Sequence, residues 1–265
     1  MSEKKWKTAI TQVKPNQVRL RGYRIDELMG RVTFAQAIFL ALIGELPSSQ
    51  VTRLLDAILV SSIDHGVTPP SVLAARTAVS TGAQLNAAIA VGVLSINRHH
   101  GGAIFDCMGI LQEGLQRAAE GNKSLDAVAG DLIAEYQTKK RRIAGLGHRI
   151  HSTDPRTDRL FSLAEELEVA GDGVAMIRAL QDALSSTGKN LPINVDGAIA
   201  ALLVDLDMPR ELANAFFIMA RVPGLVAHIH EERMRERPMR HIHPTDHEYD
   251  GPEPRSLSTS LEMTK

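Results

Sequence analysis

Apolar residues recur at helical spacing along most of this chain, and that periodicity restricts the possible folds more than any other feature. In the segment TFAQAIFLALIG, residues 33–44, the apolar side chains fall on one helical face, with Thr33 as N-cap and Gly44 as stop. Alternation at period two is scarce, apart from a possible strand pair within residues 9–21. The predicted fold class is therefore all-α. Further helices are expected over residues 49–63, 72–96 with a break near 80–82, 104–119, 124–137, 157–169, 174–184, 198–206 and 210–221.

Composition excludes several classes of protein. The chain has 265 residues, 44% of them hydrophobic, with 30 Lys and Arg against 31 Asp and Glu and a single cysteine. A net charge of −1 gives no positive field for nucleic acid, and apolar stretches are interrupted before reaching membrane-spanning length. The N-terminus lacks the apolar core of a signal peptide, and Cys107 has no cysteine partner in the chain. We therefore expect a cytoplasmic protein without nucleic-acid or membrane partners.

No repeat or flexible linker divides the sequence into halves. We predict one domain over residues 1–251, within which a smaller helical lobe could occupy about residues 101–189. Residues 252–265 contain few apolar side chains and read as a polar C-terminal tail.

Three short segments contain residues that helix packing does not require. HHGGA places His100 before two glycines, GLGHRIHSTDPR contains His148 and Arg156, and LPINVDGAIAALL contains Asp196 in an apolar run. Two histidines and a carboxylate suit acid–base chemistry at a carbonyl, and arginines bind carboxylates through paired hydrogen bonds. Taken alone, Asp196 would be better explained as a helix N-cap than as a catalytic group.

Metal binding is not expected. The histidines between 228 and 247 are irregularly spaced and have no cysteines beside them, so a zinc site is disfavoured. Cys107 falls at an apolar helical position and is expected to be a buried structural thiol. We predict no metal and no cofactor.

The three segments, together with IMARVPGLVAHIHEE and SSIDHGVTPPSVLAARTAVSTG, occur in the order found in the citrate synthase family. The chain resembles that family over residues 8–251, which implies a citrate synthase-like helical fold. The short stretch between Pro47 and the DHG motif resembles the compact citryl-CoA lyases, relatives of the C-terminal lyase module of ATP citrate lyase.

The resemblance implies roles for individual residues. His100 would stabilise the enol of the acetyl thioester, Asp196 would move the proton on its methyl carbon, and His148 would hydrogen-bond the oxaloacetate carbonyl oxygen. Substrate carboxylates would be bound by His65, Arg156, Arg221 and Arg240, the last acting across a subunit interface. Coenzyme A would contact Arg142, Ala144, Gly145, Leu146, Gly147, Arg149 and Asn194. The KKRR run at 139–142 is either a solvated face or a contact for the coenzyme A phosphates.

The resemblance also implies substrates and partners. Citryl-CoA would be cleaved to acetyl-CoA and oxaloacetate by a homo-oligomer, with a separate citryl-CoA synthetase as the source of the substrate. Two alternatives remain open: a citrate or 2-methylcitrate synthase, and a non-catalytic homologue that binds coenzyme A thioesters.

Overall fold

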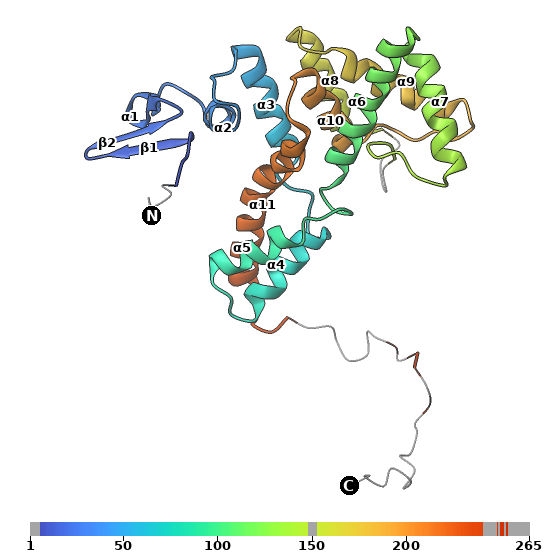
Figure 1. The fold of residues 1–265 in the computed structure, drawn as a ribbon. Coiled ribbons are helices and arrows are strands. Elements are labelled where there is room, and N and C mark those ends of the chain that lie inside the picture. The colour runs from blue at the N-terminus through green and yellow to red at the C-terminus, as the bar shows by residue number, and fades with distance from the viewer. Residues whose placement is uncertain (1–5, 148–152, 241–247, 249, 252, 254–265) are drawn as a thin grey trace, which may run out of the picture.

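The computed structural model describes residues 6–147, 153–240, 248, 250, 251 and 253 of the chain. It begins with a small antiparallel sheet in the order β1-β2-β3, formed by Thr11–Lys14, Gln17–Leu20 and Tyr23–Arg24 (Figure 1). Helices form the rest of the fold, so the predicted class and the predicted strand pair are both confirmed. They are α1 (Ile25–Leu28), α2 (Phe34–Ile43), α3 (Ser49–Ser61), α4 (Pro70–Ser80), α5 (Leu85–Leu94), α6 (Ala103–Gly121), α7 (Leu125–Thr138), α8 (Pro155–Glu166), α9 (Asp172–Ser185), α10 (Val195–Asp205), the 3-10 helix η1 (Arg210–Leu212) and α11 (Ala213–Arg235).

The helix boundaries follow local signals in the sequence. Thr33 forms a capping box with Gln36 at the start of α2, and Gly44 ends that helix in the left-handed conformation with a φ of 102°. Several helix boundaries differ from the prediction by two or three residues, and the end of α11 differs by more. Helix α10 begins three residues earlier than expected, at Val195, and α11 continues to Arg235 although Pro223 lies inside it. Packing of the C-terminal half of α11 against α4 and α5 explains this extension, because tertiary contacts outweigh a local helix breaker.

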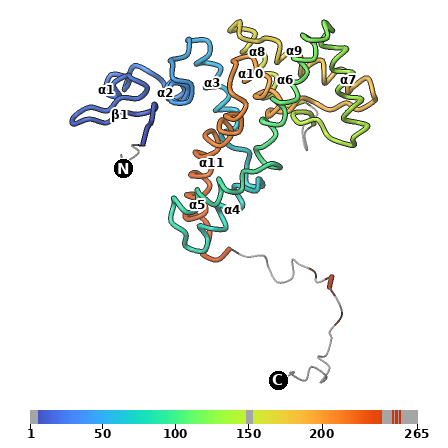
Figure 2. The backbone as a smooth tube through the Cα atoms, in the orientation of Figure 1, coloured from blue at the N-terminus to red at the C-terminus, as the bar shows by residue number. Residues whose placement is uncertain are grey.

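The helices enclose two apolar cores. The larger core contains buried side chains from α3, α6, α7, α8, α9, α10 and the start of α11. The smaller core is formed by α4, α5 and the second half of α11, which lie together below the main body in Figure 2. Gly92 of α5 allows the close approach of the α4–α5 hairpin, since a Cβ there would lie 3.2 Å from Ala75 Cβ. The division of the chain into a domain and a smaller lobe stays a prediction.

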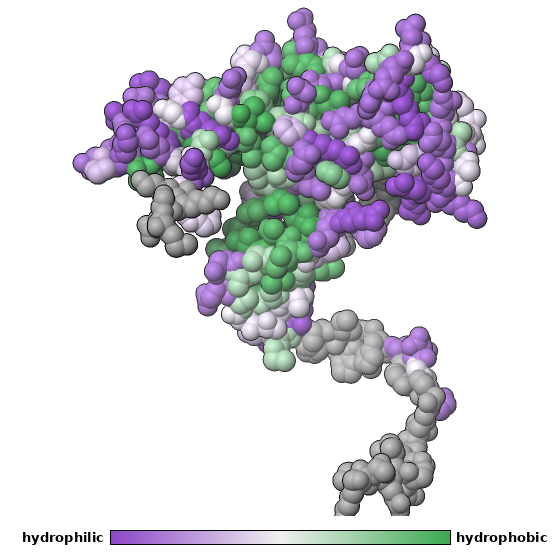
Figure 3. Space-filling model, viewed as in Figure 1, coloured by the Kyte–Doolittle hydropathy of each residue, from purple (hydrophilic) through white to green (hydrophobic). Residues whose placement is uncertain are grey.

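The segment Arg210–Arg235 is an apolar helix of 26 residues, although the sequence predicts no apolar stretch of membrane-spanning length. By length and composition alone it could cross a membrane, with a mean hydropathy of 1.5 in its most apolar window. Half of that window is buried in the fold, and core helices pass the same test. Apolar surface on the visible face gathers where α4, α5 and α11 meet (Figure 3). Leu94, the last residue of α5, is one of the exposed apolar side chains of the described residues.

Candidate active site

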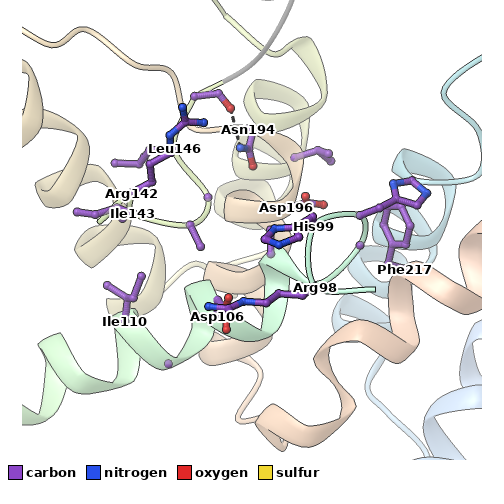
Figure 4. A pocket seen from close by; sticks show the side chains of 18 of the residues that line it. Arg98, His99, Asp106, Ile110, Arg142, Ile143, Leu146, Asn194, Asp196 and Phe217 are labelled. Atoms are coloured by element: carbon purple, nitrogen blue, oxygen red, sulfur yellow. Dashed lines mark hydrogen bonds between the residues drawn. The ribbon is translucent and has the colours of Figure 1, made fainter. Parts of the chain in front are cut away.

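A pocket of about 900 Å³ lies between the two cores, and most of the predicted site residues line it. Its walls come from the loops before α4, α6 and α10, from one face of α6, from the segment 141–147, and from residues of α8, η1 and α11 (Figure 4). Two predicted residues, His148 and Arg149, lie outside the described residues. The predicted residues that line the pocket are His65, His100, Arg142, Ala144, Gly145, Leu146, Gly147, Arg156, Asn194, Asp196 and Arg221.

His100 is held at the tip of a tight turn before α6. The backbone N–H of His100 donates to Asn97 O at 2.9 Å, and Asn97 N–H donates to His100 O at 2.8 Å. The Nε2 atom of His100 shares a 2.8 Å hydrogen bond with Ser71 Oγ, and Phe217 packs edge-on against the imidazole. These contacts fix the orientation of the ring beside the pocket.

Asp196 is not the N-cap of α10. The cap is Asn194, whose Oδ1 accepts a hydrogen bond from Gly197 N at 3.0 Å. Among the described residues, Asp196 Oδ1 is buried without a hydrogen-bond partner. Burial raises the pKa of Asp196 to about 6, although the positive charges of Arg156 and Arg221 oppose that rise. A carboxyl group with such a pKa can accept and return a proton near neutral pH.

Arg156 reaches the pocket from the first turn of α8. The buried carboxylate of Asp154 holds it, accepting hydrogen bonds from Nε at 3.0 Å and from Nη2 at 2.8 Å. Asp154 Oδ2 also accepts the backbone N–H of Val195 at 3.2 Å. One buried acid therefore joins the arginine to the start of α10, beside Asp196.

Arg221 lies on α11 and is almost completely buried, with 2% of its surface exposed. Its Nε donates to Ser62 O at 3.0 Å, and its guanidinium lies over the ring of Phe217. Its Nη1 atom is buried and has no hydrogen-bond partner among the described residues. Burial lowers the pKa of Arg221, and the carboxylates of Asp64 and Asp196 partly offset that effect. An unpaired buried N–H beside a pocket suits a bound anion.

The segment 145–147 packs tightly against α10. Gly145 and Gly147 have φ angles of 89° and 95°, in the left-handed region that favours glycine. A Cβ on Gly145 would lie 2.6 Å from Cys107 Sγ, and one on Gly197 would collide with Gly145 O. Asn194 Nδ2 donates to Gly147 O at 2.7 Å, which fixes the turn to the helix cap (Figure 4).

Arg240 does not line the pocket of its own chain. Its guanidinium pairs with Glu232 at 2.9 Å and with Glu236 at 2.5 Å, beyond the end of α11. Its predicted role across a subunit interface stays a prediction.

Three arginines line the pocket that were not among the predicted site residues. Arg98 directly precedes the HHGGA motif, and Arg141 lies within the KKRR run, for which a contact with the coenzyme A phosphates was one of two expected roles. Arg210 lies beside no such motif: its Nε donates to Phe105 O at 2.9 Å, across 105 residues of sequence. With these three, the described lining includes Arg98, Arg141, Arg142, Arg156, Arg210 and Arg221 against Asp106, Glu113 and Asp196. Such a lining attracts an anionic ligand.

The described residues contain no group of three or more side chains that could hold a metal ion. Of the five histidines between 228 and 247, three lie outside the described residues. Cys107 is buried, as predicted, and burial strongly raises the pKa of its thiol.

Comparison with known proteins gives the family. The family model described as "Citrate synthase, C-terminal domain" matches residues 47–245. The chain belongs to the citrate synthase family. The resemblance that the motifs carry is therefore confirmed.

Solved structures agree with this membership. The chain is similar to citryl-CoA lyase from Hydrogenobacter thermophilus, with a TM-score of 0.86 and 42% sequence identity over 95% of this chain and 97% of that one. ATP citrate lyase from Methanosaeta concilii, solved in complex with (3S)-citryl-CoA, has the same fold at 22% identity and a TM-score of 0.78. The match covers 96% of this chain and 43% of that chain.

Curated relatives include other members of the citrate synthase family. Citrate synthase from Heyndrickxia coagulans is 29% identical over 199 residues, covering 73% of this chain and 51% of the relative. ATP-citrate synthase beta chain protein 1 from Oryza sativa is 26% identical over 83% of this chain and 36% of the relative. The chain thus spans about half or less of the length of these two relatives.

Proposed function

We propose that this protein is a citryl-CoA lyase that cleaves citryl-CoA to acetyl-CoA and oxaloacetate. The observation that carries the proposal is the 42% identity to citryl-CoA lyase from Hydrogenobacter thermophilus over nearly the whole of both chains. The pocket supports it through its excess of arginines, which suits a substrate with several carboxylates and phosphates.

The protons and electrons of the proposed cleavage balance without a cofactor. His148 accepts the proton of the tertiary hydroxyl group, the bond between the hydroxyl-bearing carbon and the thioester's α-carbon breaks, and the hydroxyl-bearing carbon becomes the carbonyl of oxaloacetate. The electron pair passes into the enolate of acetyl-CoA, and His100 stabilises the enolate oxygen by donating a hydrogen bond to it. Asp196 in its acid form returns a proton to the carbon, and its pKa of about 6 supports that role.

Ligand contacts are proposed for the remaining predicted residues. His65, Arg156 and Arg221 bind the carboxylate groups of the substrate, with Arg240 contributed by a second copy of the chain. Arg142, Arg149, Asn194 and the segment 144–147 contact coenzyme A. We further propose a homo-oligomer in the cytoplasm, supplied with citryl-CoA by a separate synthetase.

A second candidate function is citrate or 2-methylcitrate synthesis. It is favoured by relatives such as the citrate/2-methylcitrate synthase of Bacillus subtilis, which is 32% identical over 203 residues. Synthesis would use the same groups in reverse and add hydrolysis of the citryl thioester.

One pair of assays separates these functions. In the cleavage assay, purified protein is mixed with synthetic citryl-CoA, and oxaloacetate is followed by coupling to malate dehydrogenase. In the condensation assay, the protein is mixed with acetyl-CoA and oxaloacetate, and a thiol reagent follows the release of free coenzyme A. Rapid oxaloacetate release with little free thiol is expected. Rapid thiol release in the condensation assay would instead establish a synthase, and silence in both would favour a non-catalytic homologue that binds coenzyme A thioesters.

A further inference from the structure

His65 lies in the connection between α3 and α4, residues 62–69, which forms neither helix nor strand. Its side chain is exposed and lines the pocket. A loop residue binds a ligand in a fixed geometry only when neighbouring residues restrain the loop. The restraints on this loop come from α11.

One face of α11 contacts this loop at two successive positions. Arg221 Nε donates to Ser62 O, and one helical turn later Gly224 packs against the loop backbone. A Cβ on Gly224 would collide with Ile63 O, so glycine is required for the approach. A third contact follows four residues further along the same face, at His228.

The contact at His228 is a hydrogen bond to the side chain that precedes His65. His228 Nε2 lies 3.0 Å from Asp64 Oδ1, and only 11% of the His228 side chain is exposed. The other carboxylate oxygen, Oδ2, accepts the backbone N–H of Gly66 at 2.9 Å. The Asp64 carboxylate therefore bonds on both sides of His65. Its Oδ1 is hydrogen-bonded to His228 on α11, and its Oδ2 accepts the backbone N–H of Gly66, the residue after His65.

The charge state of Asp64 agrees with this arrangement. Burial favours the neutral acid, but the N–H of Gly66, the charge of His228 and the N–H of His65 together hold the pKa of Asp64 below its ordinary value. Asp64 is thus an ionised acceptor, and His228 carries the donor hydrogen on Nε2.

We propose that His228 is a positioning residue for a dicarboxylate substrate, acting through Asp64 to hold His65 in place to bind the substrate together with Arg221. The inference rests on the proposed function, because it takes oxo-acid binding at His65 and Arg221 as given. It adds a residue that contacts no substrate but sets the distance between two substrate ligands.

A matched pair of substitutions isolates the hydrogen bond. In His228→Gln the amide nitrogen occupies the position of Nε2 and still reaches Asp64, whereas in His228→Asn the shorter amide reaches only the position of Nδ1. Both are neutral and polar. His230→Asn is the control, since His230 is an exposed histidine on the same helix.

Two readouts are taken for each variant: the Kd for oxaloacetate by calorimetry, and kcat and KM for citryl-CoA cleavage. His228→Asn is expected to raise both the Kd and the KM about tenfold with kcat within about threefold of wild type, since misplacing one ligand weakens binding. His228→Gln and His230→Asn are expected to stay within about twofold of wild type on both measures. Circular dichroism and Tm confirm that each variant is folded.

The outcomes are separable. Equal oxaloacetate affinity for His228→Gln and His228→Asn, or a fall in kcat at unchanged Kd, would overturn the positioning role. If His228→Asn does not fold, Asp64→Ala removes the same hydrogen bond from the loop side and carries the same expected tenfold change. A wild-type protein that neither binds oxaloacetate nor cleaves citryl-CoA would overturn the proposed function, and that result is seen before any variant is made.

Discussion

The carboxylate of Asp154 accepts two hydrogen bonds from the guanidinium of Arg156, of 3.0 and 2.8 Å, and these bonds fix the direction in which the arginine faces the pocket. Arg156→Lys is expected to weaken oxaloacetate binding about 10- to 100-fold, because an ammonium group cannot bond Asp154 and a substrate carboxylate in the same planar geometry. Calorimetry measures the Kd. Arg159→Lys, an exposed position on the same helix, serves as control. Unchanged affinity in Arg156→Lys would remove Arg156 from the carboxylate site.

Asp196→Asn is expected to abolish turnover while leaving the fold intact, because the amide cannot move a proton. The exchange of acetyl-CoA methyl protons into D₂O, followed by NMR, reports on that step directly. In the wild type the exchange rate should fall as pH drops below about 6, since the carboxylate that removes the proton becomes protonated. Exchange at the wild-type rate in Asp196→Asn would exclude this residue as the base.

The same pKa predicts a pH dependence of stability. Because folding raises the pKa of Asp196 from 3.8 to about 6, its protonated form favours the folded state below pH 3.8, and that contribution is lost as pH rises through 6. Asp196→Asn has no carboxyl group to ionise, so it does not lose this stabilisation as pH rises. Its free energy of unfolding at pH 8 should exceed that of wild type by up to about 3 kcal/mol. Urea unfolding at pH 4 and pH 8 measures the difference. A variant less stable at pH 8 than wild type would contradict it.

Gly197→Ala is expected to lower Tm and disturb the segment 145–147, because the new Cβ would collide with Gly145 O. Because the obstructing atom belongs to the backbone and cannot rotate away, the free energy of unfolding is expected to fall by about 1–3 kcal/mol. Gly130→Ala, in the middle of α7 with nothing within 4 Å of the added Cβ, should stabilise by up to about 1 kcal/mol. Thermal unfolding of the two variants tests the packing of the turn. Similar Tm values for both variants would contradict the prediction, because they would mean that the segment 145–147 shifts to accommodate the added methyl group.

Glu232→Ala is expected to destabilise the protein by up to about 3–5 kcal/mol, because it removes the 2.6 Å partner of the buried Arg76 and leaves only Glu231, at 3.7 Å. Glu232 is 2% exposed and lies 2.6 Å from Arg76 Nε. Glu236→Ala removes an exposed partner of Arg240 and should change stability by less than about 0.5 kcal/mol. Denaturant unfolding compares the pair, and a small loss in Glu232→Ala would mean that water or a shift of α4 solvates Arg76.

Helical periodicity was sufficient to predict the fold class and most of the helices, because each amphipathic face reflects burial on one side. It could not predict that α11 continues past Pro223, since that extension depends on packing against α4 and α5. The three motif segments do converge on one pocket. The contacts that fix these segments in place, such as Ser71 with His100 and Asp154 with the backbone N–H of Val195, join residues far apart in the sequence, and only the folded chain determines that pairing.

Helix α11 belongs to both apolar cores, packing on α4 and α5 along one half and on α3 and α6 along the other. Neither core can therefore open without breaking contacts to the same helix, and the two should exchange amide hydrogens as one cooperative unit. Arg221 lies on this shared helix, with Phe217 one turn before it and His228 two turns after it. We therefore expect the α11 wall of the pocket to be among the slowest-exchanging parts of the described molecule, and the loop that carries His65 to exchange faster.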